Sequence, residues 1–146
     1  MGFMDRFMEA AKEQAEKEKK KAVKRAADNA VEVPEGLSTS TVYTYDGRPL
    51  KGVRVGSTIR LVFVGGTHKM ESIYTGTVAE GNVAVAYKGR LVGFISANRN
   101  SDLMASVRDN LGPLSIQATV DGRSDGGWPE ITLHYNRKWL LDHAKK

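Results

Sequence analysis

The pattern of apolar and polar positions divides the chain into two parts near residue 34. From Phe3 to about Ala30 there is no glycine or proline, and nearly every residue is a good helix former. Near the start of this segment, apolar side chains recur at helical spacing on one stripe, formed by Phe3, Met4, Phe7, Met8 and Ala11. We therefore predict a long, charged N-terminal helix within residues 1–33. Pro34 and Gly36 mark its end.

After residue 34 the pattern changes to short β-branched and aromatic runs separated by glycine-containing turns. This spacing is typical of a small β-barrel or sandwich. Strands are expected at residues 41–45, 58–64, 72–78, 82–87, 90–95, 114–120 and 129–135. The last two alternate between apolar and polar residues, so each has one face in water. Residues 79–81 are interpreted as a turn, and Lys88-Gly89 as the turn of a hairpin.

Two shorter helices are expected beside these strands. Asn100, Ser101 and Asp102 offer capping side chains for a helix that ends at Gly112. The face of this helix that covers the core comprises Leu103, Met104, Val107 and Leu111. A second, short helix around Trp139 seals the barrel end. The predicted fold class is α+β: a small, mainly antiparallel β-barrel over residues 34–146 with one or two short helices, preceded by the long helix.

The composition lies in the range of ordinary globular proteins and removes several kinds of chemistry. There is no cysteine, so disulfides, thiolate-bound metals and thiol nucleophiles are excluded. The longest apolar run, Leu61–Val64, is far shorter than the ~20 residues that span a bilayer, and the N-terminal residues lack a signal-peptide pattern. We therefore expect a cytoplasmic protein, and membrane contact is not expected.

The net charge of +5 belongs to the β domain. Residues 1–35 hold eight basic and eight acidic residues, whereas the rest of the chain holds fourteen basic and nine acidic residues. A basic domain face is typical of proteins that bind phosphate groups, although an excess of this size also serves solubility alone. Within the helix, residues 1–16 carry a net charge of −2 and residues 17–25 carry +5. Charge is therefore separated along the helix.

Three roles are open to the N-terminal helix. Its apolar tip docks on its own domain or on a partner, or the helix lies on a membrane surface, or it is a tether in solvent. We favour docking, because a membrane helix would place basic residues around the apolar tip, and this tip is acidic. The partner-binding residues would be Phe3, Met4, Phe7 and Met8. Pairs at i,i+4, such as Glu13 with Lys17 and Glu16 with Lys20, would let the remainder stay in water.

No arrangement of residues indicates an active site. The three histidines, His68, His134 and His143, lie far apart without a metal-binding spacing. Residues 65–69 lack the Gly-Lys-Ser/Thr ending of a phosphate loop and are interpreted as a β-turn. Neither a nucleophile elbow nor a pair of carboxylates for acid–base catalysis stands out. We expect no catalytic residue, no metal and no other cofactor.

Residues 82–95 read Asn-Val-Ala-Val-Ala, a turn, and Val-Gly-Phe-Ile. This stretch resembles the HIRAN domain, whose core reads Asn-Ala-Ile-Ala-Val, a turn, and Ile-Gly-Tyr-Ile or Leu. The resemblance continues in the family's order over about residues 40–136, through the expected helix at 102–111 and the strand at 114–120. It implies an OB-like β-barrel with accompanying helices. Some members of the family bind the end of single-stranded DNA, and members occur alone or attached to helicase-like and nuclease machinery.

This sequence departs from the family pattern where DNA binding is located. The family's loop before the Asn-Ala strand carries Asn-Pro-Tyr-Asp, and Gly66–Gly81 contains no such sequence. The first strand of the family usually has a basic residue beside a tyrosine, whereas Tyr43 and Tyr45 have no adjacent arginine. The resemblance therefore implies the fold and leaves the nucleotide pocket open.

We expect a non-catalytic binding module with one of two kinds of partner. In the first, the barrel binds single-stranded DNA or RNA, and Tyr43, Tyr45 or Phe94 stacks on the bases. The contacts to the backbone would come from Arg48, Lys51, Arg54, Arg60, Lys88, Arg90 and Arg99. The opposing interpretation is that Phe94 is part of the core and the arginines are scattered. In the second, the module binds a protein partner or itself through the N-terminal helix.

Overall fold

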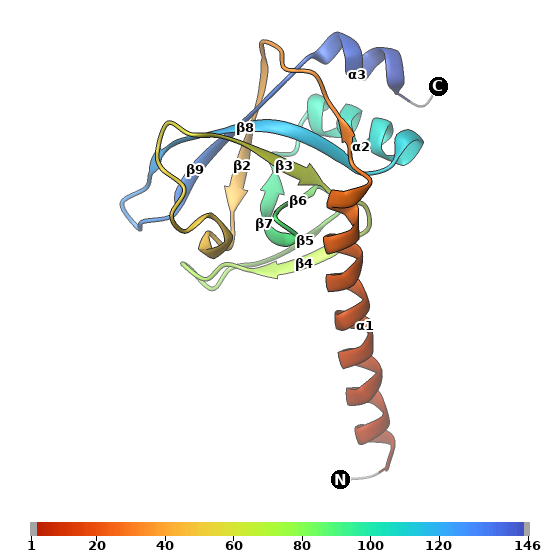
Figure 1. Cartoon of the computed structure of the whole chain (residues 1–146). Helices are drawn as coiled ribbons and strands as arrows, with labels where there is room; N and C mark the ends of the chain where they lie inside the picture. Colours follow the sequence, from red (N-terminus) through yellow and green to blue (C-terminus); the bar gives the residue numbers. More distant parts are fainter. Residues whose placement is uncertain (1–2, 145–146) are drawn as a thin grey trace.

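The computed structural model describes the backbone of residues 3–144 and the side chains of residues 10–144. A long N-terminal helix projects from a small β-barrel that carries two further helices (Figure 1). The elements in chain order are α1 (Phe3–Asp28), β1 (Val31–Glu32), β2 (Ser38–Thr44), η1 (Arg48–Leu50), β3 (Thr58–Phe63), β4 (His68–Glu71), β5 (Val78–Gly81), β6 (Ala84–Tyr87), β7 (Arg90–Ile95), α2 (Arg99–Leu111), β8 (Leu114–Arg123), β9 (Pro129–Tyr135) and α3 (Arg137–His143).

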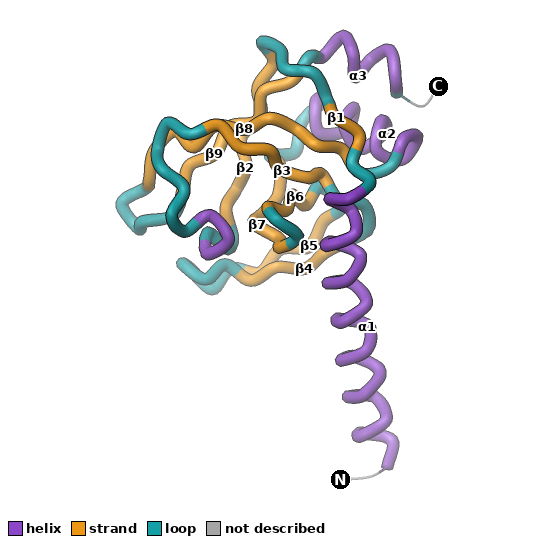
Figure 2. Tube along the Cα trace, in the orientation of Figure 1, coloured by secondary structure: helices purple, strands orange, loops and turns teal. Residues whose placement is uncertain are grey.

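The main sheet closes into a barrel. Its strands follow the order β8-β3-β6-β7-β2-β9, and β9 pairs back with β8 (Figure 2). All pairings around the barrel are antiparallel. One edge of β8 pairs with β3, while the other edge is shared by β9 and by the short parallel strand β1. The prediction of a small antiparallel barrel with a long preceding helix is confirmed.

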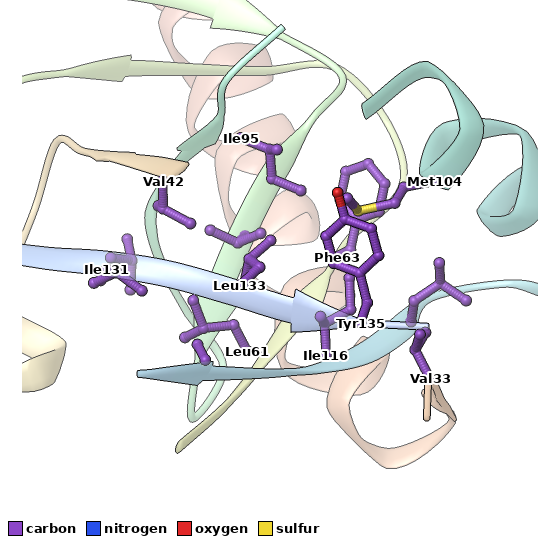
Figure 3. Close-up of a cluster of buried hydrophobic side chains, with 14 of the residues drawn as sticks. Val33, Val42, Leu61, Phe63, Ile95, Met104, Ile116, Ile131, Leu133 and Tyr135 are labelled. Carbon is purple, nitrogen blue, oxygen red and sulfur yellow. The ribbon is translucent and has the colours of Figure 1, made fainter. Parts of the chain in front are cut away.

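The alternation of residue types in the strands places one face of each inside the barrel. Along β8, the residues from Leu114 to Val120 are buried at every second position, and β9 shows the same period. Phe63, Ile116 and Tyr135 lie in this core, with Met104 closing one end (Figure 3). The buried hydroxyl of Tyr135 lies 2.7 Å from the Ser40 hydroxyl and donates to a main-chain oxygen, so its polar group is satisfied.

Two helices cover the end of the barrel. The helix α2 begins one turn earlier than the sequence predicts, because the Asn98 side chain accepts a hydrogen bond from the Ser101 amide and the Ser101 hydroxyl accepts one from the Asn98 amide. Met104 and Val107 are buried in the main core, whereas Leu111 is exposed. Leu140 of α3 joins the same core. Sealing of the barrel by two helices is therefore observed.

The prediction of a strand over residues 72–78 is wrong. Residues 72–77 form a turn, and the strands β4 and β5 lie on either side of it as a separate hairpin. The Ser72 hydroxyl accepts hydrogen bonds from the amides of Tyr74 and Thr75, and Gly76 adopts a positive φ of 74°. β-branched and aromatic residues raised the strand propensity of this segment, but hydrogen bonds from side chain to backbone stabilise the turn.

The helix α1 meets the barrel through its C-terminal end. Val23 and Ala26 are buried, whereas every described side chain from residue 10 to residue 22 is exposed. The helix ends at Asp28, and Val31 already pairs with β8, so the barrel begins a few residues before the expected boundary at residue 34. The predicted tip residues Phe3, Met4, Phe7 and Met8 lie outside the described side chains. Among residues 3–144, no helix has the length and apolarity to cross a membrane.

A buried arginine ties α2 to the strands. The Arg108 side chain is almost fully buried, and its guanidinium lies 4.6 Å from the centre of the Phe63 ring. Its Nη1 donates to the main-chain oxygens of Val64 and Asn82. These acceptors and the aromatic face stabilise a charge that would be costly to bury alone. Arg108 is therefore a structural residue.

Candidate functional site

The outer surface of the barrel has two faces of opposite character. On one face, outward side chains of β3, β6 and β7 are covered by the end of α1 and by the β4–β5 hairpin. We call this the covered face; its buried residues are Val23, Ala26, Val64, Ala84, Ala86 and Phe94. On the other face, the outward side chains of β2 and β9 carry no second layer and form a groove.

Two of the aromatic residues considered for base stacking lie at the covered face. Phe94 is only 7% exposed and packs with Val23 and Ala26 of α1. Tyr45 meets it edge-on, with 5.4 Å between the ring centres, and is half-buried. Phe94 therefore belongs to a hydrophobic cluster, as the opposing interpretation of the sequence held.

The open groove has a volume of about 400 Å³ and lies where β9 runs along β2. Its lining residues are Thr41, Val42, Tyr43, Thr44, Trp128, Pro129, Glu130, Ile131 and Thr132. Val42 and Ile131 pair with each other and point into the barrel, so their neighbours in sequence point outward. Tyr43 is 58% exposed, which makes its ring available to a ligand.

A second aromatic residue is held at the other wall of the groove. Trp128 packs against Tyr74 of the β4–β5 turn, with 5.1 Å between ring centres. The Tyr74 hydroxyl in turn accepts a hydrogen bond of 3.0 Å from the Gly47 amide. Gly126 lies against the indole so closely that a Cβ there would be 2.1 Å from the ring. Tyr74 and the loop's own Gly126 therefore hold Trp128 in place, and Gly47 holds Tyr74.

A basic segment borders this wall. Arg48 follows Gly47 and is exposed, and its guanidinium donates hydrogen bonds of 3.0 and 2.8 Å to the two carboxylate oxygens of Asp46. These bonds lower the pKa of Asp46, and the nearby charge of Arg90 lowers it further. Lys51 and Arg54 follow in the same connection and are exposed. The groove thus has two aromatic residues in its lining, and the connection that contacts it through Gly47 is basic.

The structure separates the nine residues predicted to bind nucleic acid into three groups. The first group comprises Tyr43, which lines the groove, and Arg48, Lys51 and Arg54, which lie on the connection between β2 and β3. At the covered face or on the β6–β7 turn beside it lie Tyr45, Lys88 and Arg90. The third group consists of Arg60 on β3 and Arg99 on α2, which belong to neither of these places.

Arg60 has a structural role. It donates to the Ser115 hydroxyl at 2.8 Å, to the Ser115 main-chain oxygen at 2.7 Å and to the Val33 main-chain oxygen at 3.2 Å. These bonds link β3 to β8 and to the segment after β1. Arg99 is the first residue of α2, at the end of the barrel that the helices cover.

Sequence reasoning missed Trp128 and Tyr74. The sequence predicts a strand at Tyr74, whereas its contact with Trp128 depends on the turn between β4 and β5. Trp128 lies in a glycine-rich connection. The periodicity of apolar residues does not predict the conformation of such a loop. The one signal in the sequence is the pair of glycines before it, because glycine often marks a bend or a place where another segment approaches closely.

The three histidines lie in separate places. His68 is buried with its Nε2 2.9 Å from the Gly65 oxygen, His134 lies 2.8 Å from the Thr119 hydroxyl, and His143 stacks on Trp139. Within the described residues, no group of three or more histidine, aspartate or glutamate side chains is arranged to hold a metal ion.

Comparisons of the chain with protein-family models, with curated proteins and with solved structures found no match.

Proposed function

We propose that this protein is a non-catalytic module that binds single-stranded nucleic acid, DNA or RNA, in the groove between β2 and β9. The observation that carries the proposal is the pairing of an exposed Tyr43 with a held Trp128 across one open groove. Aromatic side chains in such positions accept stacked bases, each worth about 1–3 kcal/mol. Bases of a duplex are stacked on one another and unavailable, so the groove favours a single strand.

The charge around the groove supports the same ligand. Arg48 follows Gly47, which packs against Pro129 of the groove, and Lys51 and Arg54 lie further along the same connection. All three are exposed, so they would contact phosphates while the bases stack. Glu130 on the lining opposes a polyanion, and the phosphate path therefore runs on the side of η1. The resemblance to HIRAN domains, some of which bind single-stranded DNA ends, adds to this argument. A cytoplasmic location is proposed on the sequence grounds given above.

The two tryptophans of the chain allow a direct test. Trp139→Phe leaves Trp128 as the single tryptophan, and titration with an oligothymidine should quench its fluorescence in a salt-dependent manner. Trp128→Ala should weaken binding about tenfold or more, the equivalent of one lost stacking contact of about 1.4 kcal/mol.

Trp139→Ala is the matched control. Trp139 is also half-buried and also stacked on a ring, that of His143, but it lies on α3 away from the groove. Its removal should leave affinity within about twofold, well below the cost of one stacked base. Absence of binding at low salt, or equal losses for the two alanine variants, contradicts the proposal.

A further inference from the structure

The helix α1 carries a dense basic run that the groove does not use. Residues 17–25 contain six lysines and arginines and one carboxylate, Glu18. All six cationic side chains are exposed. None of these six cationic groups lies within 4 Å of a carboxylate among the described side chains. The expected pairs of Glu13 with Lys17 and of Glu16 with Lys20 are therefore not formed. Residues 17–25 thus carry a net charge of +5 without a direct ion pair among the described side chains.

Helix geometry gathers most of this charge on one side. Positions separated by three, four and seven residues share a helix face. The lysines with this spacing are Lys17, Lys20, Lys21 and Lys24. Val23 and Ala26 point elsewhere, into the covered face, and Glu18 accepts a hydrogen bond from Gln14. Lys12 and Lys19 share a different face of the same helix. The stripe formed by Lys17, Lys20, Lys21 and Lys24 is about 10 Å long, because the helix rises 1.5 Å per residue.

The barrel supplies two more cations at the end of this stripe. Lys88 and Gly89, with φ of 48° and 80°, form the tight turn between β6 and β7. A Cβ at Gly89 would lie 3.0 Å from Cγ and 3.3 Å from Cα of Lys24, so the turn rests directly on the helix. Lys88 and Arg90 flank this contact and are exposed. The lysine stripe therefore continues onto the barrel.

A further link connects the turn to the groove. Arg90 begins β7, and the Asp46 amide donates a hydrogen bond of 2.9 Å to the Val92 main-chain oxygen of the same strand. The Asp46 carboxylate is in turn bonded to Arg48. Gly47, the next residue, donates to Tyr74, which packs on Trp128. Cations thus follow one another from α1 over the β6–β7 turn to the groove. We call this series the basic track: Lys17, Lys20, Lys21, Lys24, Lys88, Arg90 and Arg48.

We propose that the basic track binds the phosphate backbone of a nucleic-acid strand that leaves the groove, so that the full site extends over α1. This inference rests on the function proposed above and adds a direction and a length to it. Single-strand binding proteins combine a positively charged path for the backbone with aromatic platforms for the bases, and the track and groove supply one each. Neutralising several phosphates releases counterions, which gives affinity without sequence preference.

The part of α1 whose side chains are described lacks what a lipid surface would require. A helix that lies on a membrane needs a large apolar face beside its basic residues. Between residues 10 and 26, the single apolar side chain larger than alanine is Val23, and it is buried against the barrel. The exposed surface of this part of α1 is therefore cationic without an apolar face, which fits a polyanion in water.

The test compares two double variants of one helix against a short and a long oligothymidine. Lys17→Gln with Lys24→Gln removes two charges from the track. Lys12→Gln with Lys19→Gln removes two charges at the same spacing from a different face, and glutamine keeps the helix propensity in both. Affinity and its salt dependence would be measured with strands of about 5 and about 20 nucleotides, which bracket the site sizes of small barrels.

The track variant should bind the long strand on the order of tenfold more weakly at about 100 mM salt, with a log–log salt slope smaller by about 1.4. Its affinity for the short strand should be unchanged, and the control should stay within about twofold for both strands, which is the expectation for charges that contact no phosphate. Equal weakening by the two variants, or no change in the track variant, overturns the proposal.

Two further arms separate the possible failures. If the long strand binds with the predicted dependence on Lys17 and Lys24 while Trp128→Ala has no effect, the groove proposal fails and phosphate binding by α1 stands. If vesicles of phosphatidylserine and phosphatidylcholine bind with the same dependence and the long oligothymidine does not, the track is a lipid surface and the inference is overturned. Loss of long-strand binding in both the Trp128 and track variants supports one continuous site.

Discussion

The two outer faces of the barrel are built from the same kind of strand and differ in whether anything covers them. On the covered face, Phe94 is only 7% exposed because α1 and the β4–β5 hairpin pack on it. On the open face, Tyr43 retains 58%. Both residues are aromatic and both lie on neighbouring paired strands, Tyr43 directly opposite Phe94. Residue type therefore does not distinguish a structural aromatic from a binding aromatic, and a second layer of structure does.

This difference predicts opposite consequences of substitution on the two faces. Burial of apolar surface stabilises the folded state, so residues of the covered face contribute to the free energy of unfolding. An exposed ring contributes little to folding and retains its surface for a ligand. Substitutions on the covered face should therefore reduce stability, and those on the open face should reduce affinity.

The largest effect is expected at Phe94. Phe94→Ala removes a buried ring from between α1, Tyr45 and the strands, and should lower the free energy of unfolding by about 3 kcal/mol or more. Urea denaturation measures this directly. A loss below about 1 kcal/mol would mean that the covering layer contributes little to packing. The claim that the two faces differ in their contribution to stability would then be wrong.

A charge placed under α1 should have the next largest effect. Val23→Asp puts a carboxylate where the side chain is 5% exposed, so the end of α1 should detach at a cost of about 2 kcal/mol. Hydrogen exchange should then increase for the last turns of α1 and for β6, while β8 and β9 remain protected. The matched control is Ala22→Asp, on the exposed side of the same turn. Equal losses in the two variants would contradict docking through Val23.

On the open face, Tyr43→Ala should leave the free energy of unfolding within about 0.5 kcal/mol, because most of the ring is already in water. Its affinity for a short oligothymidine should fall about tenfold through loss of one stacked base. Fluorescence anisotropy with a labelled strand gives the affinity. Leu37→Ala, at a residue that is fully exposed and outside the groove, should change neither quantity.

The smallest effect is expected at Asp46. Asp46→Asn frees the Arg48 guanidinium from its carboxylate, so affinity for single strands should rise a few-fold at low salt. The lowered pKa of Asp46 means that its ion pair stabilises the fold above the ordinary aspartate pKa of about 3.9, and that this contribution is lost as pH falls through the lowered value. The stability difference between the two proteins should thus be present at neutral pH and vanish in strong acid.

Much of the barrel could be predicted because its strands bury one face. Period-two alternation identified β8 and β9 within a few residues of their observed bounds, and the turn at Lys88-Gly89 identified the β6–β7 hairpin. The β4–β5 hairpin could not be predicted in the same way. Its strands are short and lie largely in solvent, so no clean alternation marks them, and the Ser72 hydroxyl decides the turn.

The site was predicted in part. Tyr43 and Arg48 were identified from residue type, and both lie at the groove or on its border. Arg60 satisfied the same criterion, yet its guanidinium is bound to main-chain and side-chain oxygens of neighbouring strands. Charge and aromaticity can be read from a sequence, whereas the partners that occupy a side chain depend on which distant strands become neighbours. Trp128 was missed for the same reason.

The attachment of α1 gives the protein a lever arm. The helix is fixed at its base by Val23 and Ala26, and the strand β1 begins within three residues of its end and is bonded to β8. From Val23 back to Ala10 the helix extends about 20 Å at 1.5 Å per residue. A rotation of about 10° at the base would therefore displace Ala10 by about 3.5 Å. Small adjustments of packing at the barrel are amplified along the helix into movements as large as an atom's diameter.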